Sequence, residues 1–115
     1  MMIYKVCSKV VWEEIRRLTF WNGSPDDLRD GFIHFSTALQ LEGTVRKHYA
    51  GQTDLILLAI DADTLGDAVK WEPSRDGDLF PHLYGPLPIS TVARVQDLAV
   101  EPDGTINDNR LLPDE

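Results

Sequence analysis

The 115-residue sequence contains one cysteine, Cys7, and only three histidines. A single cysteine cannot form an internal disulfide bond, and it excludes zinc sites that are built from several thiolates. The histidines show neither HxH nor HExxH spacing, so no metal site is predicted. A lone cysteine in an apolar segment is usually a buried hydrophobic residue. We therefore expect a reduced compartment, the cytoplasm.

Long hydrophobic runs and an excess of positive charge are also missing. No apolar segment approaches the roughly 20 residues of a membrane span, and the opening "MMIYKVCSKVVWEE" lacks the pattern of a signal peptide. Lys and Arg number 11 against 19 Asp and Glu, which gives a net charge of −8. Phosphate backbones require a basic face, so the sequence predicts no general nucleic-acid binding. The lack of a long apolar segment predicts no membrane association. A small phosphorylated ligand, held by a few local groups, is still compatible with this charge.

The hydrophobic content, 43%, is sufficient for one core in a chain of this length. A single domain over residues 1–115 is expected, with a flexible tail at about residues 107–115. Hydrophobic periodicity predicts an α+β fold with two helices, at residues 9–18 and 37–50, and a mostly antiparallel sheet of strands at residues 3–8, 31–36, 54–61, 68–72 and 90–101. The continuous apolar run at 54–61 indicates a strand covered on both faces. Turn residues and prolines predict loops at 20–30 and 73–88, and a hairpin turn at 102–106.

The stretch "GFIHFST" places a histidine in the middle of an apolar strand that leads into a helix. Side chains alternate along a strand, so Phe32, His34 and Ser36 are predicted to share one face. Free N–H groups at a helix start attract anions, which predicts a ligand site at His34, Ser36 and Thr37. The structural alternative is that Thr37 and Gln40, which have the spacing of a capping box, only begin the helix. In that case His34 is a satisfied core histidine.

A second stretch, "LFPHLYGPLP", combines aromatic residues and a histidine in a proline-rich segment. Prolines fix φ and stiffen the chain. If the segment is extended, Phe80, His82 and Tyr84 share a face, as in the wall of a binding site. We predict that this face meets the face of His34, so that both histidines point into one cleft. The alternative is an aromatic loop that serves folding only.

Glu72 ends the strand predicted before that segment. We predict that it lies at the rim of the same cleft, where it acts as a base or holds a ribose hydroxyl. The alternative is an edge-strand carboxylate in water, which is the usual place of glutamate.

Several stretches together resemble a bacterial family known as domain of unknown function 952. They are "IYKV", "GFIHFST" followed by Gln40, "DLILLAID", "VKWEPS" and "FPHLYGPLP", and in order and spacing they extend to about Leu98. The resemblance implies a reduced version of the ADP-ribosyltransferase fold, an α+β scaffold with a split, mostly antiparallel sheet, whose enzymes bind NAD between two half-sheets. This class of enzymes also includes transferases that remove a 2′-phosphate from RNA. Relatives often carry a histidine where this chain has Lys5.

The resemblance and the residues lead to three hypotheses. The first is an ADP-ribosyl- or phosphotransferase-like enzyme, or a binder of NAD, ADP-ribose or a phosphorylated ribose. Its catalytic candidates are Glu72, His34 and His82, and its ligand-binding candidates are Ser36, Thr37, Gln40, Phe80 and Tyr84. The second is a non-catalytic module that binds a small anion or a protein. The third is a small hydrolase that uses the histidines and Glu72. The sequence predicts no oligomeric state.

Overall fold

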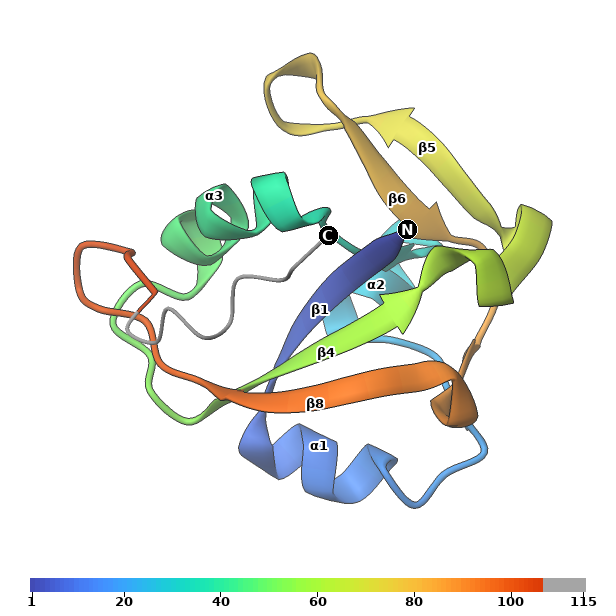
Figure 1. The fold of residues 1–115 in the computed structure, drawn as a ribbon, viewed down its shortest axis with the longest axis horizontal. Helices are drawn as coiled ribbons and strands as arrows, with labels where there is room; N and C mark the ends of the chain where they lie inside the picture. The colour runs from blue at the N-terminus through green and yellow to red at the C-terminus, as the bar shows by residue number, and fades with distance from the viewer. Residues whose placement is uncertain (107–115) are drawn as a thin grey trace.

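The computed structural model describes residues 1–106 of the chain. The tail predicted at about residues 107–115 lies outside the described residues. The chain forms one small α+β domain with its helices early and most of its strands late, as predicted (Figure 1). In chain order they are β1 (Met2–Ser8), α1 (Lys9–Ile15), β2 (Phe20–Trp21), α2 (Pro25–Asp30), β3 (Ile33–His34), α3 (Ala38–His48), β4 (Leu55–Asp61), β5 (Val69–Pro73), β6 (Leu79–Leu83), β7 (Leu87–Pro88) and β8 (Val92–Leu98), with 3₁₀ turns at Ala62–Ala68, Arg75–Gly77 and Ile89–Thr91.

The strands form separate antiparallel sheets. The largest has the order β1-β4-β8, a second has the order β3-β6-β5, and β2 pairs with β7. A single bridge between Tyr4 and Ser36 joins the first two sheets. The prediction of a split, mostly antiparallel sheet is therefore confirmed. Figure 1 shows the β5–β6 hairpin standing away from the β1-β4-β8 sheet, on the same side as the start of α3.

The core lies on both faces of β4, as its continuous apolar run predicts. Ile56, Leu58 and Ile60 face α1 and belong to one cluster of buried side chains. Leu55 and Leu57 belong to a second cluster, which α3 covers with Leu41 and Val45. Cys7 is buried in the first cluster, and burial raises the pKa of its thiol to about 11. It is thus the buried hydrophobic residue that the sequence predicted.

The loop predicted at residues 20–30 contains a third helix, α2. Ser24 caps it, its hydroxyl accepts from Asp27 N–H, and the Asp27 carboxylate accepts from Ser24 N–H in return. Pro25 occupies the first turn and Gly31 ends the helix with a φ of 87°. The segment "SPDDLRDG" therefore carries complete helix start and stop signals. The prediction was wrong because Ser-Pro and Asn-Gly also mark turns.

The loop predicted at residues 73–88 begins as a tight turn but continues as strands β6 and β7. Asp76 has a φ of 59° in this turn, which brings the chain back toward β5. Pro81 lies in β6, the central strand of its sheet, where its carbonyl accepts from Phe35 N–H. Proline is usually confined to edge strands, so it concealed this strand. The hairpin turn predicted at 102–106 is confirmed by the bridge between Val100 and Ile106.

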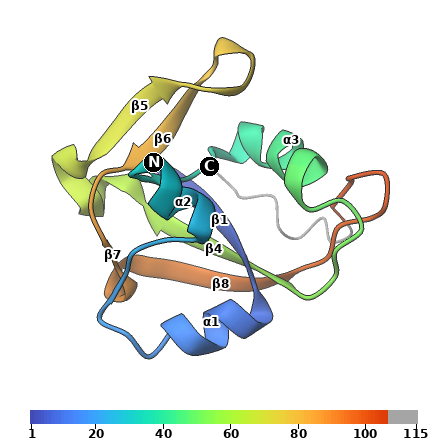
Figure 2. The ribbon, with the colours of Figure 1, turned by 180° about the vertical axis from the view of Figure 1, so that it is seen from behind.

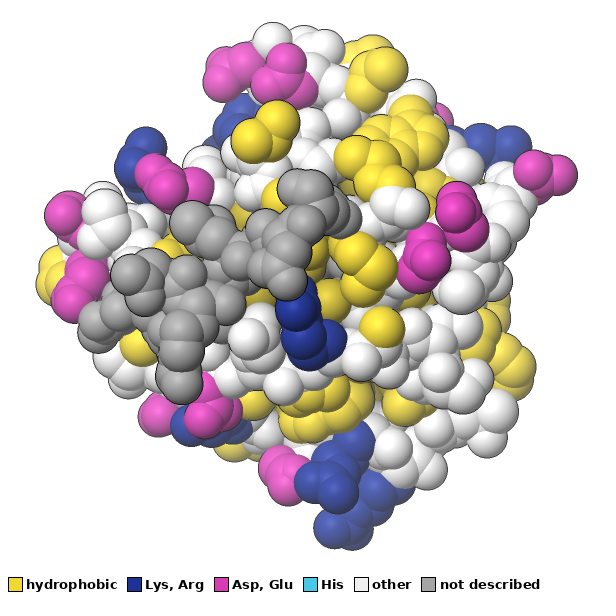
Figure 3. All heavy atoms as spheres, viewed as in Figure 1, with side chains coloured by type: hydrophobic (Ala, Val, Ile, Leu, Met, Phe, Trp, Pro, Cys, Tyr) yellow, Lys and Arg dark blue, Asp and Glu magenta, His cyan; other side chains and the backbone are white. Residues whose placement is uncertain are grey.

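The two broad faces of the domain differ. No histidine is in view on the described part of the face that carries β8, where charged groups of both signs lie around apolar patches (Figure 3). The opposite view shows α2 in front of β1, with α3 and the β5–β6 hairpin on either side (Figure 2). Among residues 1–106, no helix is long and apolar enough to cross a membrane.

Candidate functional site

The β3-β6-β5 sheet brings the two predicted histidines together. His34 of β3 and His82 of β6 are direct partners in the antiparallel register, and their ring centroids lie 5.4 Å apart. Direct partners present their side chains on the same face of a sheet. Phe32 lies beside both rings and stacks on His82 at 4.1 Å. The sequence prediction that "GFIHFST" faces "FPHLYGP" is therefore confirmed.

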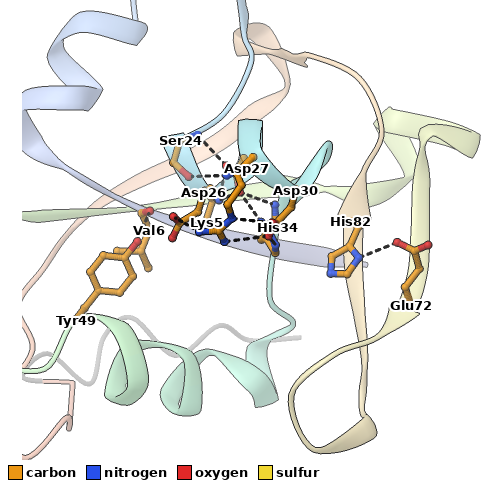
Figure 4. A network of polar contacts seen from close by, with 11 residues as sticks. Lys5, Val6, Ser24, Asp26, Asp27, Asp30, His34, Tyr49, Glu72 and His82 are labelled. Carbon is orange, nitrogen blue, oxygen red and sulfur yellow. Dashed lines mark hydrogen bonds and ion pairs between the residues drawn. The ribbon is translucent and has the colours of Figure 1, made fainter.

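His82 is held by a carboxylate from the neighbouring strand. Its Nδ1 lies 2.8 Å from Glu72 Oε1, which also accepts a hydrogen bond of 2.8 Å from the Tyr84 hydroxyl (Figure 4). The hydrogen bonds from His82 and Tyr84 lower the pKa of Glu72 from 4.5. An ionised carboxylate only accepts, so neutral His82 carries its proton on Nδ1. Its Nε2 is then a lone-pair acceptor.

His34 is held by two carboxylates of α2. Its Nδ1 lies 2.6 Å from Asp27 Oδ1, and its Nε2 lies 3.0 Å from Asp30 Oδ2. Both bonds form when both ring nitrogens carry protons. Both nitrogens of His34 are thus engaged within the protein, whereas only Nδ1 of His82 has a partner among residues 1–106.

Asp27 is the centre of this network. Besides His34 Nδ1, its carboxylate accepts from the backbone N–H groups of Ser24 and His34 and from Lys5 Nζ (Figure 4). Burial acts to raise the pKa of Asp27, but the hydrogen bond from His34 and the charge of Lys5 outweigh it, so this pKa lies well below its ordinary value. Burial is the main cause that lowers the pKa of Lys5, and Asp27 opposes it. The network joins β1, α2 and β3 beneath the histidines.

A pocket of about 460 Å³ opens next to these groups. Tyr4, Lys5 and Val6 line it along the outer edge of β1, which is the edge strand of its sheet. The side chains of α2 form one wall, and those of α3 with the turn of the β5–β6 hairpin form the other. His34 and His82 close one end. The volume is within the range of small-ligand sites.

The described lining of the pocket is more positive than the chain as a whole. Four Lys and Arg side chains and three Asp side chains line it, whereas the whole sequence has a net charge of −8. The cations are Lys5, Arg29, Lys47 and Arg75, and the anions are Asp26, Asp27 and Asp30. The charges are also separated. All three aspartates lie on α2, while Lys47 and Arg75 are on the opposite wall. The wall formed by α3 and the hairpin therefore favours an anion.

The predicted site residues fall into three groups. His34, Ser36, Phe80 and His82 line the pocket. Glu72 and Tyr84 lie behind His82 and are not among the described lining residues. Thr37 and Gln40 form the capping box of α3, and Gln40 Nε2 donates to the Leu79 carbonyl. Their side chains thus make hydrogen bonds that begin the helix and tie it to β6. The ligand-binding role of these two residues stays a prediction.

Several residues of the pocket were missed by the sequence analysis. Asp27 was placed in a loop, although "SPDD" has the spacing of a capping box and so announces a carboxylate at the third helical position. Arg75 and Lys47 were not among the predicted site residues. No local signal marks them, because their common location depends on how the β5–β6 hairpin reaches α3. Among residues 1–106, no group of three or more His, Cys, Asp or Glu side chains is arranged to hold a metal ion.

Taken together, the fold and the pocket define a small α+β domain with a histidine-lined, carboxylate-supported cleft at the edge of one sheet. Comparison with known families identifies it further. Residues 6–95 match the family model described as "Protein of unknown function (DUF952)", so the chain belongs to this family. The family resemblance inferred from the sequence motifs is therefore confirmed. No match was found among curated proteins.

Two solved structures of the protein CC0527 from Caulobacter crescentus are similar over almost the whole chain. The crystal structure has 43% sequence identity and a TM-score of 0.90, and the match covers 97% of this chain and 98% of that one. The solution structure has 43% identity and a TM-score of 0.84, with 99% and 98% covered. Neither description names an activity. The comparisons provide a fold and a family but no substrate.

Proposed function

We propose that the pocket binds a small nucleotide-type ligand, such as NAD, ADP-ribose or a phosphorylated ribose, and that His82 exchanges a proton with it. The observation that carries this proposal is the pair of His82 and Glu72. A carboxylate that fixes one nitrogen of an imidazole sets the tautomer and directs the other nitrogen to the substrate. Buried His82 lines the pocket while Glu72 does not.

In this proposal His82 is the general base. A hydroxyl group of the acceptor, or a water molecule, gives its proton to Nε2 as its oxygen attacks the ligand. The bond that breaks is either the glycosidic bond at the ribose or a phosphate ester bond, and the leaving group departs with its electron pair. This is the chemistry of an ADP-ribosyl- or phosphotransferase-like enzyme. The sequence motifs imply an ADP-ribosyltransferase-like scaffold, and the choice of ligand follows that implication by analogy.

Glu72 is a positioning residue in this scheme. It acts through His82, because its Oε1 binds Nδ1 and the Tyr84 hydroxyl. His34 contributes in a different way. With Asp27 and Asp30 on its two nitrogens, it can donate to no ligand without exchanging a partner. We therefore assign the proton transfer to His82 and the shape of the pocket to His34.

A non-catalytic binding module is the second candidate, and the engagement of both His34 nitrogens favours it. It would use the same pocket without turnover. If water is the acceptor in the first candidate, the protein is a small hydrolase.

Ligand binding and turnover separate these candidates. Thermal shift with NAD, ADP-ribose and nucleotides bearing a 2′- or 3′-phosphate reports binding, because a ligand of the folded state raises its stability. Release of nicotinamide, phosphate or nucleoside is followed by NMR. We expect Glu72→Gln and His82→Gln to retain binding and to reduce turnover by about 10²-fold or more. Arg94→Gln, on β8, is the control.

Binding without turnover in the wild type would support the binding module. No shift with any of these ligands would overturn the proposal.

A further inference from the structure

Arg75 is placed over α3 by the tight turn that connects β5 and β6. Its guanidinium donates to Thr44 Oγ1 at 3.2 Å and to the Gln40 carbonyl at 3.3 Å. It also lies 4.8 Å from the centre of the Phe80 ring. These contacts use two of the five N–H donors of an arginine, and Arg75 lines the pocket. The side chain is thus held in place and still has donors to offer.

Arg75 and Lys47 lack counter-ions among residues 1–106. No carboxylate of this part of the chain forms an ion pair with either, although the sequence has 19 acidic residues. The other two cations of the pocket are paired, Lys5 with Asp27 and Arg29 with Asp26 and Asp30. Two unpaired cations on one wall of a pocket therefore point to a negatively charged occupant.

The neighbouring groups of α3 belong to the same wall. Thr44, Lys47 and His48 follow helical spacing and all line the pocket. Burial is the first cause that lowers the pKa of His48, and the charges of Lys47 and Arg75 are the next. The positive potential of these two side chains thus reaches a third group of the wall. Thr44 Oγ1 lies 2.8 Å from Ser36 Oγ and donates to the Gln40 carbonyl at 3.2 Å, so this hydroxyl is engaged within the wall and serves to hold Arg75.

We propose that Arg75 and Lys47 form a seat for a phosphate or pyrophosphate group, with Thr44 holding the guanidinium in place. This proposal rests on the proposed function, because the seat would hold the phosphate of the ligand on which His82 acts. A planar guanidinium can bind two phosphate oxygens at once, and a lysine adds a point charge. A carboxylate ligand offers fewer oxygens to these two cationic side chains than a phosphate does. The seat and His82 line the same pocket, so one extended ligand can reach both.

The competing role of Arg75 is purely structural: it would only connect the hairpin to α3. A substitution at Gly43 distinguishes this structural role from a role in ligand binding. A Cβ atom at Gly43 would lie 3.0 Å from Arg75 Nη2, at the far end of a flexible side chain. Gly43→Ala therefore displaces the guanidinium slightly. Alanine is also the better helix former, so the fold is not weakened by the change.

The test is a titration of the folded protein with pyrophosphate, followed by calorimetry and by amide NMR shifts. We expect shifts concentrated at Thr44, Lys47 and Arg75. Arg75→Gln is expected to weaken pyrophosphate binding about tenfold or more, because it removes a charged hydrogen bond, and Gly43→Ala to weaken it severalfold at unchanged or higher thermal stability. Arg46→Gln is the matched control, because Arg46 is on the same helix, pairs with Glu42 and does not line the pocket.

Each result decides the matter. Pyrophosphate that binds with equal affinity to wild type and Arg75→Gln, or that shifts other residues, overturns the seat. If ADP-ribose or NAD binds and turns over while Arg75→Gln has no effect, the seat fails and the proposed function stands. If pyrophosphate binds at Arg75 while no nucleotide binds, the seat stands and the proposed function fails. Equal weakening by Arg46→Gln means general charge attraction and also overturns the seat.

Discussion

Lys5 and Asp27, 22 positions apart in the chain, form an ion pair of 2.8 Å inside the domain. The Asp27 side chain is 1% exposed and that of Lys5 10%. Asp27 also caps α2 through Ser24 and fixes His34, so one carboxylate holds three elements together. Removing one partner of such a pair leaves a buried charge without compensation, which costs more than the pair itself contributes.

The first prediction concerns this pair. Asp27→Asn is expected to lower the free energy of unfolding by about 3 kcal/mol, because Lys5 then remains buried without its counter-ion. Urea denaturation measures the loss. Asp26→Asn is the control on the same helix; its side chain is 71% exposed, and its ion-pair partner within residues 1–106 is Arg29. A change of about 0.5 kcal/mol or less is expected there. Similar losses in both variants would contradict the central role of Asp27.

The second prediction is the acid dependence of stability. The folded-state pKa of Asp27 lies below its ordinary value of 3.8, because His34 and Lys5 outweigh the effect of burial. A carboxyl with a lowered pKa stabilises the fold above its unfolded pKa, and this contribution is lost as the pH falls toward the folded pKa. We expect the free energy of unfolding to decrease between about pH 5 and pH 2. The decrease should be smaller in Asp27→Asn, as measured by urea denaturation at each pH.

The third prediction uses two glycines that flank α2. Gly23 has a φ of 100°, and a Cβ there would lie 2.6 Å from Asp27 Cβ. Gly31 has a φ of 87° but nothing within 4 Å of such a Cβ. Gly31→Ala is expected to cost about 1–2 kcal/mol of backbone strain. Gly23→Ala is expected to cost clearly more, since it also displaces Asp27. Equal midpoints of urea unfolding would contradict the close approach.

The fourth prediction tests the hydrogen bond of Tyr84 to Glu72. This bond is the first cause that raises the pKa of Tyr84 above 10.0. In Glu72→Gln the pKa of Tyr84 should fall back toward 10.0, which ring NMR signals report during an alkaline titration. Tyr49 is the internal control, because burial raises its pKa and Glu72 is not among the causes. An unchanged Tyr84 would show that the bond does not persist in solution.

The sequence was sufficient for the parts of the fold that depend on local pattern. The apolar run of β4 and the capping box at Thr37 follow from periodicity and from side-chain chemistry over a few residues. The alternation of "GFIHFST" also predicted which side chains share a face with His34. The apolar and aromatic residues around His34 and His82 led us to expect that the two histidines meet. The register of β3 and β6 confirms this.

The rest depends on contacts between distant segments. Asp27 could be identified only after α2 was recognised, and turn-forming residues hid that helix. Pro81 hid β6 in the same way. The environment of Arg75 depends on the direction of the hairpin, which the positive φ of Asp76 helps to set. No pattern within a single segment encodes that direction, so the positive wall of the pocket could not be foreseen.

The direct pairing of His34 with His82 makes the site dependent on strand alignment. β3 is only two residues long, and its partners in β6 are Leu83 and His82. A slip of one residue would turn a histidine toward the core and an apolar side chain toward the pocket. Misaligned forms of the domain would therefore lack the site altogether. A ligand that binds in the pocket beside His82 would therefore recognise only correctly folded molecules, and by mass action it would select the native alignment of these strands over every other.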